Sequence, residues 1–96
     1  MKVETEILDE VFAVIEDRRD SPRQDSYVSG LLAKGDAEVI RKFGEEADEL
    51  KVAVKDDEKA NIIHEAADVV FHMMVLLAAK GVRLDEVMKE LRRRRR

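Results

Sequence analysis

The feature that most constrains this chain is an apolar stretch from Ala66 to Ala79, which is interrupted only by Asp68 and His72. A helix that is apolar on most faces is normally buried on most faces. The stretch is shorter than the roughly 20 residues that a membrane span requires, so it predicts a core helix. Three or four short helices cannot easily cover such a helix, and we therefore expect at least a homodimer.

The remaining sequence predicts further helices, separated by short turn signals. Apolar residues recur at helical spacing, and no segment shows the sustained alternation that marks a strand. The fold class is therefore all-α, a small bundle of four to five helices in a single domain over residues 1–96, with an arginine-rich tail over residues 92–96. The expected helices run from Thr5 to Arg19, from Tyr27 to Ala33 after a Ser26 cap, from Asp36 to Lys55, from the break at Asp56 and Asp57 to Ala79 with Gly81 as the stop signal, and from Leu84 into the tail.

The composition excludes cysteine-based sites and argues against a nucleic-acid-binding protein. The chain has no cysteine, which excludes disulfides, thiolate metal sites and a cysteine nucleophile. Its formal net charge of -4 does not suggest a nucleic-acid binder. The start of the chain lacks the apolar segment of a signal peptide, so we expect a cytoplasmic protein with no membrane partner.

The polar residues of the central helix share one face. Asn61, Glu65, Asp68 and His72 fall within about 60° of one another when successive residues turn by 100°. Burying carboxylates costs free energy unless they are paired, hydrogen-bonded or bound to a metal. This stripe must therefore face a polar partner.

The preceding helix can supply that partner. Its apolar stripe comprises Val39, Phe43, Ala47, Leu50 and Val54. Glu46 lies at the edge of this stripe, Glu49 about 60° further round, and Glu45 furthest from the core. Close carboxylates repel one another unless a cation lies between them, and oxygen ligands favour Mg²⁺ or Mn²⁺. The alternative is a solvated helix face with surface ion pairs such as Arg41 with Glu45.

Three segments carry a resemblance to a known family. They are the segment from Ser26 to Gly35, the segment from Ile40 to Glu49 that contains Gly44-Glu45-Glu46, and the segment from Glu65 to His72. Together they resemble the phosphoribosyl-ATP pyrophosphatase family of histidine biosynthesis, within the MazG-like all-α nucleotide pyrophosphohydrolase superfamily. The likeness runs from about Leu8 to Arg94. Val28 stands where the family usually has Thr, and Phe71 where it usually has Tyr.

The resemblance implies Mg²⁺-dependent hydrolysis of phosphoribosyl-ATP to phosphoribosyl-AMP and pyrophosphate. It assigns metal binding to Glu46, Glu49, Glu65 and Asp68, and it makes Glu45, Glu46 and Glu49 the catalytic acids. Within this set, Glu45 is either an outer-shell residue or a candidate base. Two rival functions stay open, a housekeeping (d)NTP pyrophosphohydrolase and a non-catalytic helical dimerisation module.

Four further residues are candidates for substrate binding: Lys42, Arg18, Lys34 and His72. The three cations are each either phosphate contacts or ordinary surface partners of nearby acids. His72 either supports Asp68, contacts substrate or is simply a buried histidine with a hydrogen bond. Tyr27 either stacks on a base or packs at an interface, and the arginine tail either ends a helix or attracts phosphate.

Overall fold

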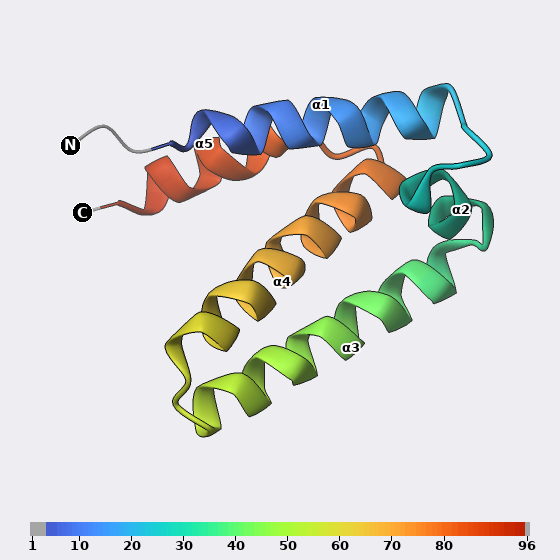
Figure 1. The fold of residues 1–96 in the computed structure, drawn as a ribbon. Helices are drawn as coiled ribbons and strands as arrows, with labels where there is room; N and C mark the ends of the chain where they lie inside the picture. The colour runs from blue at the N-terminus through green and yellow to red at the C-terminus, as the bar shows by residue number, and fades with distance from the viewer. Residues whose placement is uncertain (1–3, 96) are drawn as a thin grey trace.

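The computed structural model describes residues 4–95, and every regular element within that range is a helix. The helices are α1 (Glu6–Asp20), α2 (Tyr27–Ala33), α3 (Asp36–Lys55), α4 (Lys59–Ala79) and α5 (Leu84–Arg94), as Figure 1 shows. The all-α class and the number of helices are confirmed. α1 begins and ends one residue later than predicted, whereas α2 and α3 have the predicted bounds. Arg96 of the predicted tail lies outside the described residues.

The helix ends follow from local hydrogen bonding. The side chain of Ser26 accepts a hydrogen bond of 3.1 Å from the backbone N–H of Ser29, which caps α2 as predicted. At the end of α4, Gly81 has a φ of 70°, a conformation that glycine adopts without strain. The N–H of Gly81 bonds to the carbonyl of Ala78 at 3.2 Å, and that of Val82 to Leu77 at 2.9 Å. This Schellman pattern confirms the predicted stop at Gly81.

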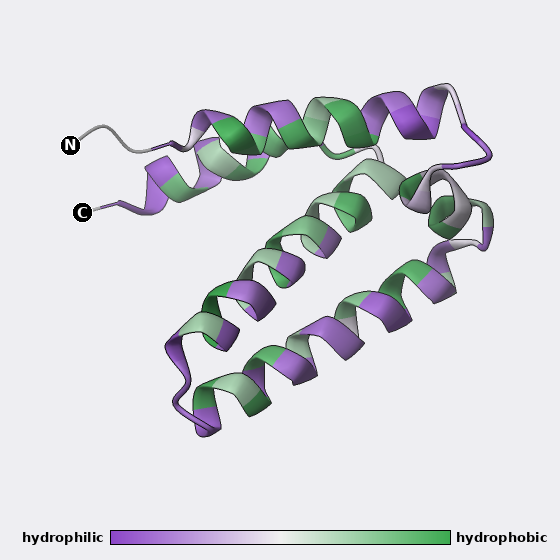
Figure 2. Ribbon diagram, viewed as in Figure 1, coloured by the Kyte–Doolittle hydropathy of each residue, from purple (hydrophilic) through white to green (hydrophobic). Residues whose placement is uncertain are grey.

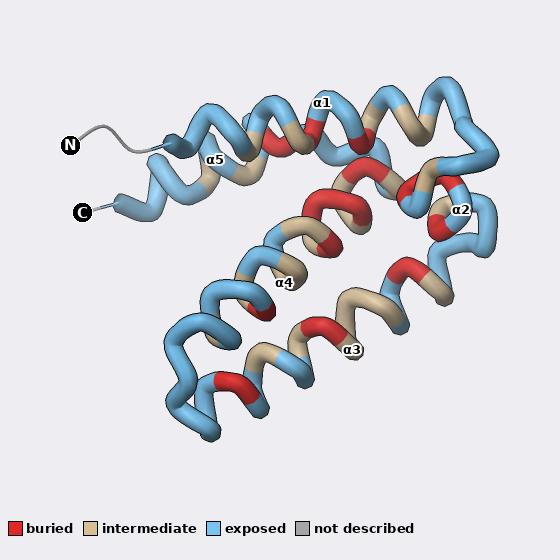
Figure 3. Tube along the Cα trace, in the orientation of Figure 1, coloured by how far each residue is buried: buried red, intermediate tan, exposed pale blue. Residues whose placement is uncertain are grey.

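The helices form an open arrangement around α4. α3 and α4 run antiparallel as a long hairpin, α1 packs across the C-terminal half of α4, and α2 bridges the junction (Figure 1). Arg83, which precedes α5, pairs with Glu16 of α1 at 3.5 Å. Buried positions gather where α1, α2 and α4 meet (Figure 3). The largest fully buried side chains there are Ile15, Val39 and Val75. The core therefore sits at one end of the α3–α4 hairpin.

The other end of the hairpin is covered much less. Val52, Val54 and Ile63 are 56%, 54% and 60% exposed, and Figure 3 shows the tips of both helices as largely exposed. Val54, which helical spacing places on the apolar stripe of α3, is exposed within the chain because neither α1 nor α2 reaches this end. Its neighbour Ala53, which faces α4, is fully buried instead.

The central helix α4 is apolar over most of its length, as Figure 2 shows. By length and composition alone it would also pass as a membrane span, with a mean hydropathy of 1.6. It packs against α1, α2 and α3 and supplies Met74, Val75 and Ala78 to the core. Within one chain, however, only part of its surface is covered, so the expected burial on most faces is not reached.

Candidate active site

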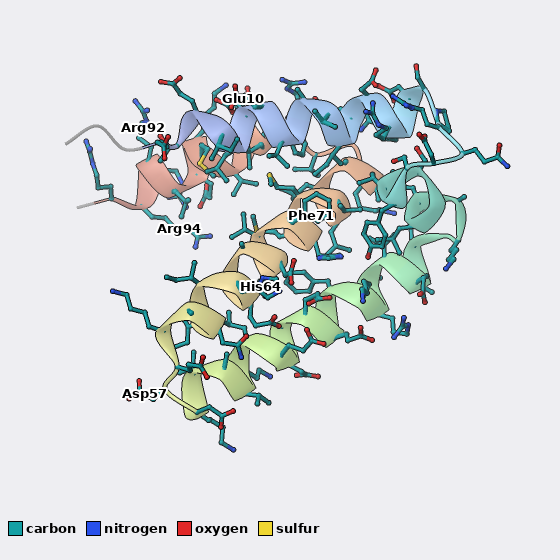
Figure 4. All side chains as sticks on the ribbon, viewed as in Figure 1. Glu10, Asp57, His64, Phe71, Arg92 and Arg94 are labelled. Carbon is teal, nitrogen blue, oxygen red and sulfur yellow. The ribbon has the colours of Figure 1, made fainter. Side chains whose placement is uncertain are left out.

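Two groups of acidic side chains meet between α3 and α4. In the first, Glu45, Glu46 and Glu49 of α3 have carboxylate oxygens within 4.8 Å of one another. In the second, ligand atoms of His64, Glu65 and Asp68 of α4 lie equally close. Figure 4 shows side chains from both helices filling the space between them, with His64 on α4 beside it.

Glu49 connects the two groups. The neighbouring carboxyls of Glu65 and Glu46 raise the pKa of Glu49 to about 7. A negatively charged neighbour disfavours ionisation, so this shift reports close carboxylates contributed by both helices. The predicted meeting of Glu46, Glu49 and Glu65 is therefore present in the structure. Asp68 adjoins Glu65 on the next turn, with its side chain 37% exposed. We call Glu46, Glu49, Glu65 and Asp68 the carboxylate cluster.

Each buried member of the cluster has one carboxylate oxygen without a hydrogen-bond donor among the described residues. Glu46 and Glu65 are only 6% and 8% exposed. Their Oε2 atoms are buried and find no hydrogen-bond partner among residues 4–95. A buried carboxylate oxygen without a partner carries a large desolvation cost. Because the four cluster residues offer only oxygen ligands, the arrangement fits a hard divalent cation such as Mg²⁺.

Glu45 differs from the other acids of α3. Its carboxylate accepts hydrogen bonds from Lys42 at 2.8 Å and from Arg41 at 2.9 Å, and these cations lower its pKa. The helical geometry predicts Glu45 as the acid furthest from the core, but Glu45 is half-buried and Glu49 is the more exposed. Arg41 and Lys42 cover the Glu45 carboxylate, so its exposure is lower than its place on the helix predicts.

Lys42 stands at the boundary between the acids and a second pocket. Its Nζ lies 3.3 Å from Glu46 Oε1, and hydrogen bonding to Glu45 raises its pKa, so it stays protonated. Lys42 also lines a pocket between α2 and α3 together with Lys34, Arg41 and Tyr27. We call it the basic pocket. Two predicted substrate residues, Lys42 and Lys34, thus share one pocket next to the cluster.

Arg18 lies in a different place. It lines a pocket at the junction of α1, α2 and the start of α3, together with Arg19 and Ser29. Its guanidinium pairs with Asp17 at 2.6 Å, and its backbone carbonyl accepts a hydrogen bond of 2.8 Å from Ser29. The structure therefore brings Lys34 and Lys42 together and keeps Arg18 apart from them.

His72 is buried and doubly hydrogen-bonded. Its Nδ1 lies 2.8 Å from the carbonyl oxygen of Asp68, and its Nε2 lies 2.9 Å from the hydroxyl of Tyr27. The ring also meets Phe71 edge-on, with centroids 5.2 Å apart. Of the predicted alternatives, the contacts within the chain match the buried histidine that is hydrogen-bonded to a neighbour.

Sequence reasoning missed one residue beside the acids, His64, and one contact, that of Tyr27 with His72. His64 has its Nε2 3.5 Å from Glu65 Oε1 and 3.5 Å from Asp68 Oδ2, on a side chain that is 70% exposed. The four-residue spacing between His64 and Asp68 could have indicated this contact, since such residues are neighbours on a helix. The contact of Tyr27 joins it to a residue of α4 that lies 45 positions away, so it leaves no local signal.

Comparisons with known proteins agree with the resemblance in the sequence. The model of a family described as phosphoribosyl-ATP pyrophosphohydrolase matches residues 8–95. The phosphoribosyl-ATP pyrophosphatase of Haloarcula marismortui is 45% identical over 92 residues, which cover 94% of each chain. That of Methanococcoides burtonii is 45% identical over 91 residues, or 93% of this chain and 92% of its own. That of Bacillus cytotoxicus is 44% identical over 88 residues, which cover 92% of this chain and 82% of its own.

Proposed function

Because this chain belongs to the phosphoribosyl-ATP pyrophosphohydrolase family, we propose that its carboxylate cluster serves the reaction of that family. The reaction is the hydrolysis of phosphoribosyl-ATP to phosphoribosyl-AMP and pyrophosphate, the second step of histidine biosynthesis. One water molecule adds across the anhydride between the α and β phosphates, and pyrophosphate leaves. The observation that carries the proposal is the pair of buried, partnerless carboxylate oxygens on Glu46 and Glu65.

The cofactor is Mg²⁺, with Mn²⁺ as a substitute, held by Glu46, Glu49, Glu65 and Asp68. All four residues offer carboxylate oxygens, and two of them are buried, which is the setting in which a divalent cation offsets desolvation and mutual repulsion. When bound, Mg²⁺ supplies charge neutralisation for the phosphates, orientation of the leaving group and a lower pKa for its water.

The protein's own residues supply the positioning around the cluster. Lys42 stays protonated and stands 3.3 Å from Glu46, so it can contact phosphate oxygens at the edge of the cluster. Lys34 adds a second cation to the basic pocket. Phosphoryl transfer depends chiefly on such positioning and charge stabilisation. Arg18 remains a candidate for a more distant part of the substrate, since it lines another pocket.

Glu45 acts in an outer position and not as the base. Two hydrogen bonds from cations lower its pKa, which makes its carboxylate a weak proton acceptor. The same bonds hold Lys42 next to Glu46. Glu45 therefore contributes by fixing the position of Lys42, while Glu46 and Glu49 face the reacting groups.

The active protein is a homodimer. The chain exposes 7261 Å², whereas a compact monomer of 11.0 kDa exposes about 5,600 Å². Its radius of gyration is 14.5 Å, against about 12.5 Å for a compact domain of this length. An apolar groove between α1 and α4 is lined by Ile7, Val11, Val70 and Phe71, and it reaches Asp68. A second copy seated there would cover the open faces of α4 next to the carboxylate cluster.

Light scattering of the wild type and of two single variants tests the dimer. The proposal expects twice the chain mass at micromolar concentration. Inserting a charge by Val70→Glu should give monomers, whereas the same change at Val54, outside the groove, should leave the dimer intact. A wild-type protein that stays monomeric at assay concentration would reject this part of the proposal.

The location of the enzyme is the cytoplasm, and its function involves neither a membrane nor a nucleic acid.

A substrate panel tests the activity itself. Pyrophosphate release is measured with phosphoribosyl-ATP, ATP and the four dNTPs under the same conditions. The proposal expects phosphoribosyl-ATP to have the highest kcat/KM. Strong activity on dNTPs with none on phosphoribosyl-ATP would favour the housekeeping pyrophosphohydrolase, and no activity at all would favour the dimerisation module.

A further inference from the structure

A chain of two hydrogen bonds joins α2 to the metal-binding face of α4. The hydroxyl of Tyr27, the first residue of α2, lies 2.9 Å from His72 Nε2. On the other side of the ring, Nδ1 lies 2.8 Å from the carbonyl oxygen of Asp68. His72 is 5% exposed, and the rings of Tyr27 and Phe71 pack against it at centroid distances of 5.8 and 5.2 Å. The imidazole therefore has little freedom to turn.

The chemistry of these partners sets the direction of both hydrogen bonds. A backbone carbonyl only accepts, so His72 Nδ1 must carry a proton and donate it to the oxygen of Asp68. In the neutral ring, Nε2 then has no proton and accepts. The phenol of Tyr27 must therefore donate its single proton to His72. The phenol oxygen retains only lone pairs, and so it can accept but not donate further.

This phenol lies near the groups that bind metal and phosphate. Burial raises the pKa of Tyr27, and the charge of Lys42 opposes that shift. The negative charges of Glu46, Glu45 and Asp68 act on it as well, which puts the hydroxyl in electrostatic range of both α3 and α4. A bound nucleotide can reach this side chain, since Tyr27 is 52% exposed and lines the basic pocket.

We propose that Tyr27 and His72 form one positioning unit, in which His72 holds the phenol proton and the phenol oxygen accepts a hydrogen bond from the bound nucleotide. The partner on the nucleotide is a donor, a ribose hydroxyl or the adenine amino group, and not a phosphate oxygen. His72 acts only through Tyr27 and is itself a positioning residue. The inference rests on the proposed function for the identity of the nucleotide, but not for the state of His72.

The state of His72 is tested first, without substrate. The chain has only one tyrosine and two histidines, so ¹⁵N NMR of the imidazoles is readily assigned with a His64→Gln variant. We expect a proton on Nδ1 of His72 and an accepting Nε2. In Tyr27→Phe, which keeps the aromatic ring, the Nε2 resonance should shift while the proton stays on Nδ1. A proton on Nε2 of the neutral ring, or an unchanged Nε2 resonance in Tyr27→Phe, would overturn the inference.

Kinetics then test the positioning role. Tyr27→Phe should raise KM for phosphoribosyl-ATP about fivefold to tenfold, the loss of one substrate hydrogen bond. Its affinity for Mn²⁺ in the absence of nucleotide should match the wild type. His72→Phe should show a similar rise in KM, and the double variant should be no worse than the worse single variant. Additive losses would contradict one unit, and weaker Mn²⁺ binding in Tyr27→Phe would assign the residue to the metal instead.

The two levels of failure are distinguishable. If wild-type protein does not hydrolyse phosphoribosyl-ATP, the proposed function fails whatever the spectra show. If it does hydrolyse phosphoribosyl-ATP but Tyr27→Phe has an unchanged KM, only the inference about Tyr27 and His72 fails. Thermal melts of each variant show whether a loss of activity reflects unfolding.

Discussion

The carboxyl of Glu49 on α3 lies within hydrogen-bonding range of the carboxyl of Glu65 on α4, and this contact is the largest cause of the raised pKa of Glu49. Acids on two helices therefore compete for protons across the gap. In the metal-free protein this contact is favourable only while one proton is shared, because two ionised carboxylates repel each other. The fold thus holds an arrangement that a proton or a cation stabilises.

The first prediction concerns pH. The pKa of Glu49 is about 7 in the folded protein, against an ordinary value of 4.5, so the folded state binds more protons between these values. The stability of the metal-free protein should therefore decrease as pH rises from about 5 to about 8. Thermal melts in EDTA over this range measure the effect as a falling Tm. With saturating Mg²⁺ the fall should disappear, because metal replaces the proton.

Glu49→Gln supplies the control for this pH effect. An amide at position 49 cannot titrate, so the Tm of the metal-free variant should depend less on pH across this range. A matched change at Asp48, an exposed acid on the same helix that pairs with Lys51, should leave the wild-type pH dependence in place. If Asp48→Asn flattened the profile as much as Glu49→Gln, the Glu49–Glu65 contact would not be its source.

The second prediction concerns the buried ligand Glu65. Loss of an outer-shell partner weakens metal binding by about 10–100-fold, so Glu65→Gln should weaken Mg²⁺ binding by at least about tenfold. The same change removes a buried charge, and the Tm of the metal-free protein should rise by a few degrees. Calorimetric titration with Mg²⁺ and melts in EDTA measure the two effects. Unchanged affinity together with a raised Tm would mean that Glu65 does not bind the metal.

The third prediction concerns Lys42. Replacing it with Gln removes a charge-assisted contact to phosphate, and KM for phosphoribosyl-ATP should rise by about tenfold or more. Lys51 offers a matched control, because it is also a lysine of α3 and pairs with Asp48, an acid three residues away, as Lys42 pairs with Glu45. Steady-state kinetics should show no change for Lys51→Gln. Equal effects at both positions would point to the general charge of α3 and not to a phosphate contact.

The fourth prediction separates two roles of Glu45. If Glu45 only positions Lys42, Glu45→Gln should lower kcat/KM by about tenfold and leave the shape of the pH–rate profile unchanged. Loss of a general base would instead cost about 10²–10⁴-fold and remove the acidic limb of the profile. The pH dependence of kcat/KM for this variant distinguishes the two.

Much of the fold could be predicted from local sequence signals. Ser26 caps α2 and Gly81 ends α4, and both rely on interactions among near neighbours. The carboxylate stripe on α4 could be found because Glu65 interrupts an otherwise apolar helix. Such signals are local, and a single sequence contains them completely.

Features that depend on how helices meet could not be predicted in the same way. Helical periodicity places Val54 on the apolar stripe of α3, but among the described helices only α4 reaches that end, and it leaves Val54 exposed. The partial burial of Glu45 goes with its ion pairs to Arg41 and Lys42, which periodicity does not describe. The contact of Tyr27 with His72 joins residues 45 positions apart and requires the packing of α2 onto α4.

The most direct test of the central claim is pyrophosphate release from phosphoribosyl-ATP by the wild-type protein and by Glu46→Gln, first in EDTA and then with excess Mg²⁺. We predict no release in EDTA by either protein, full recovery by the wild type when Mg²⁺ is added, and little recovery by Glu46→Gln. Release by the wild type in EDTA, or full recovery by Glu46→Gln, would contradict a catalytic metal held by the carboxylate cluster.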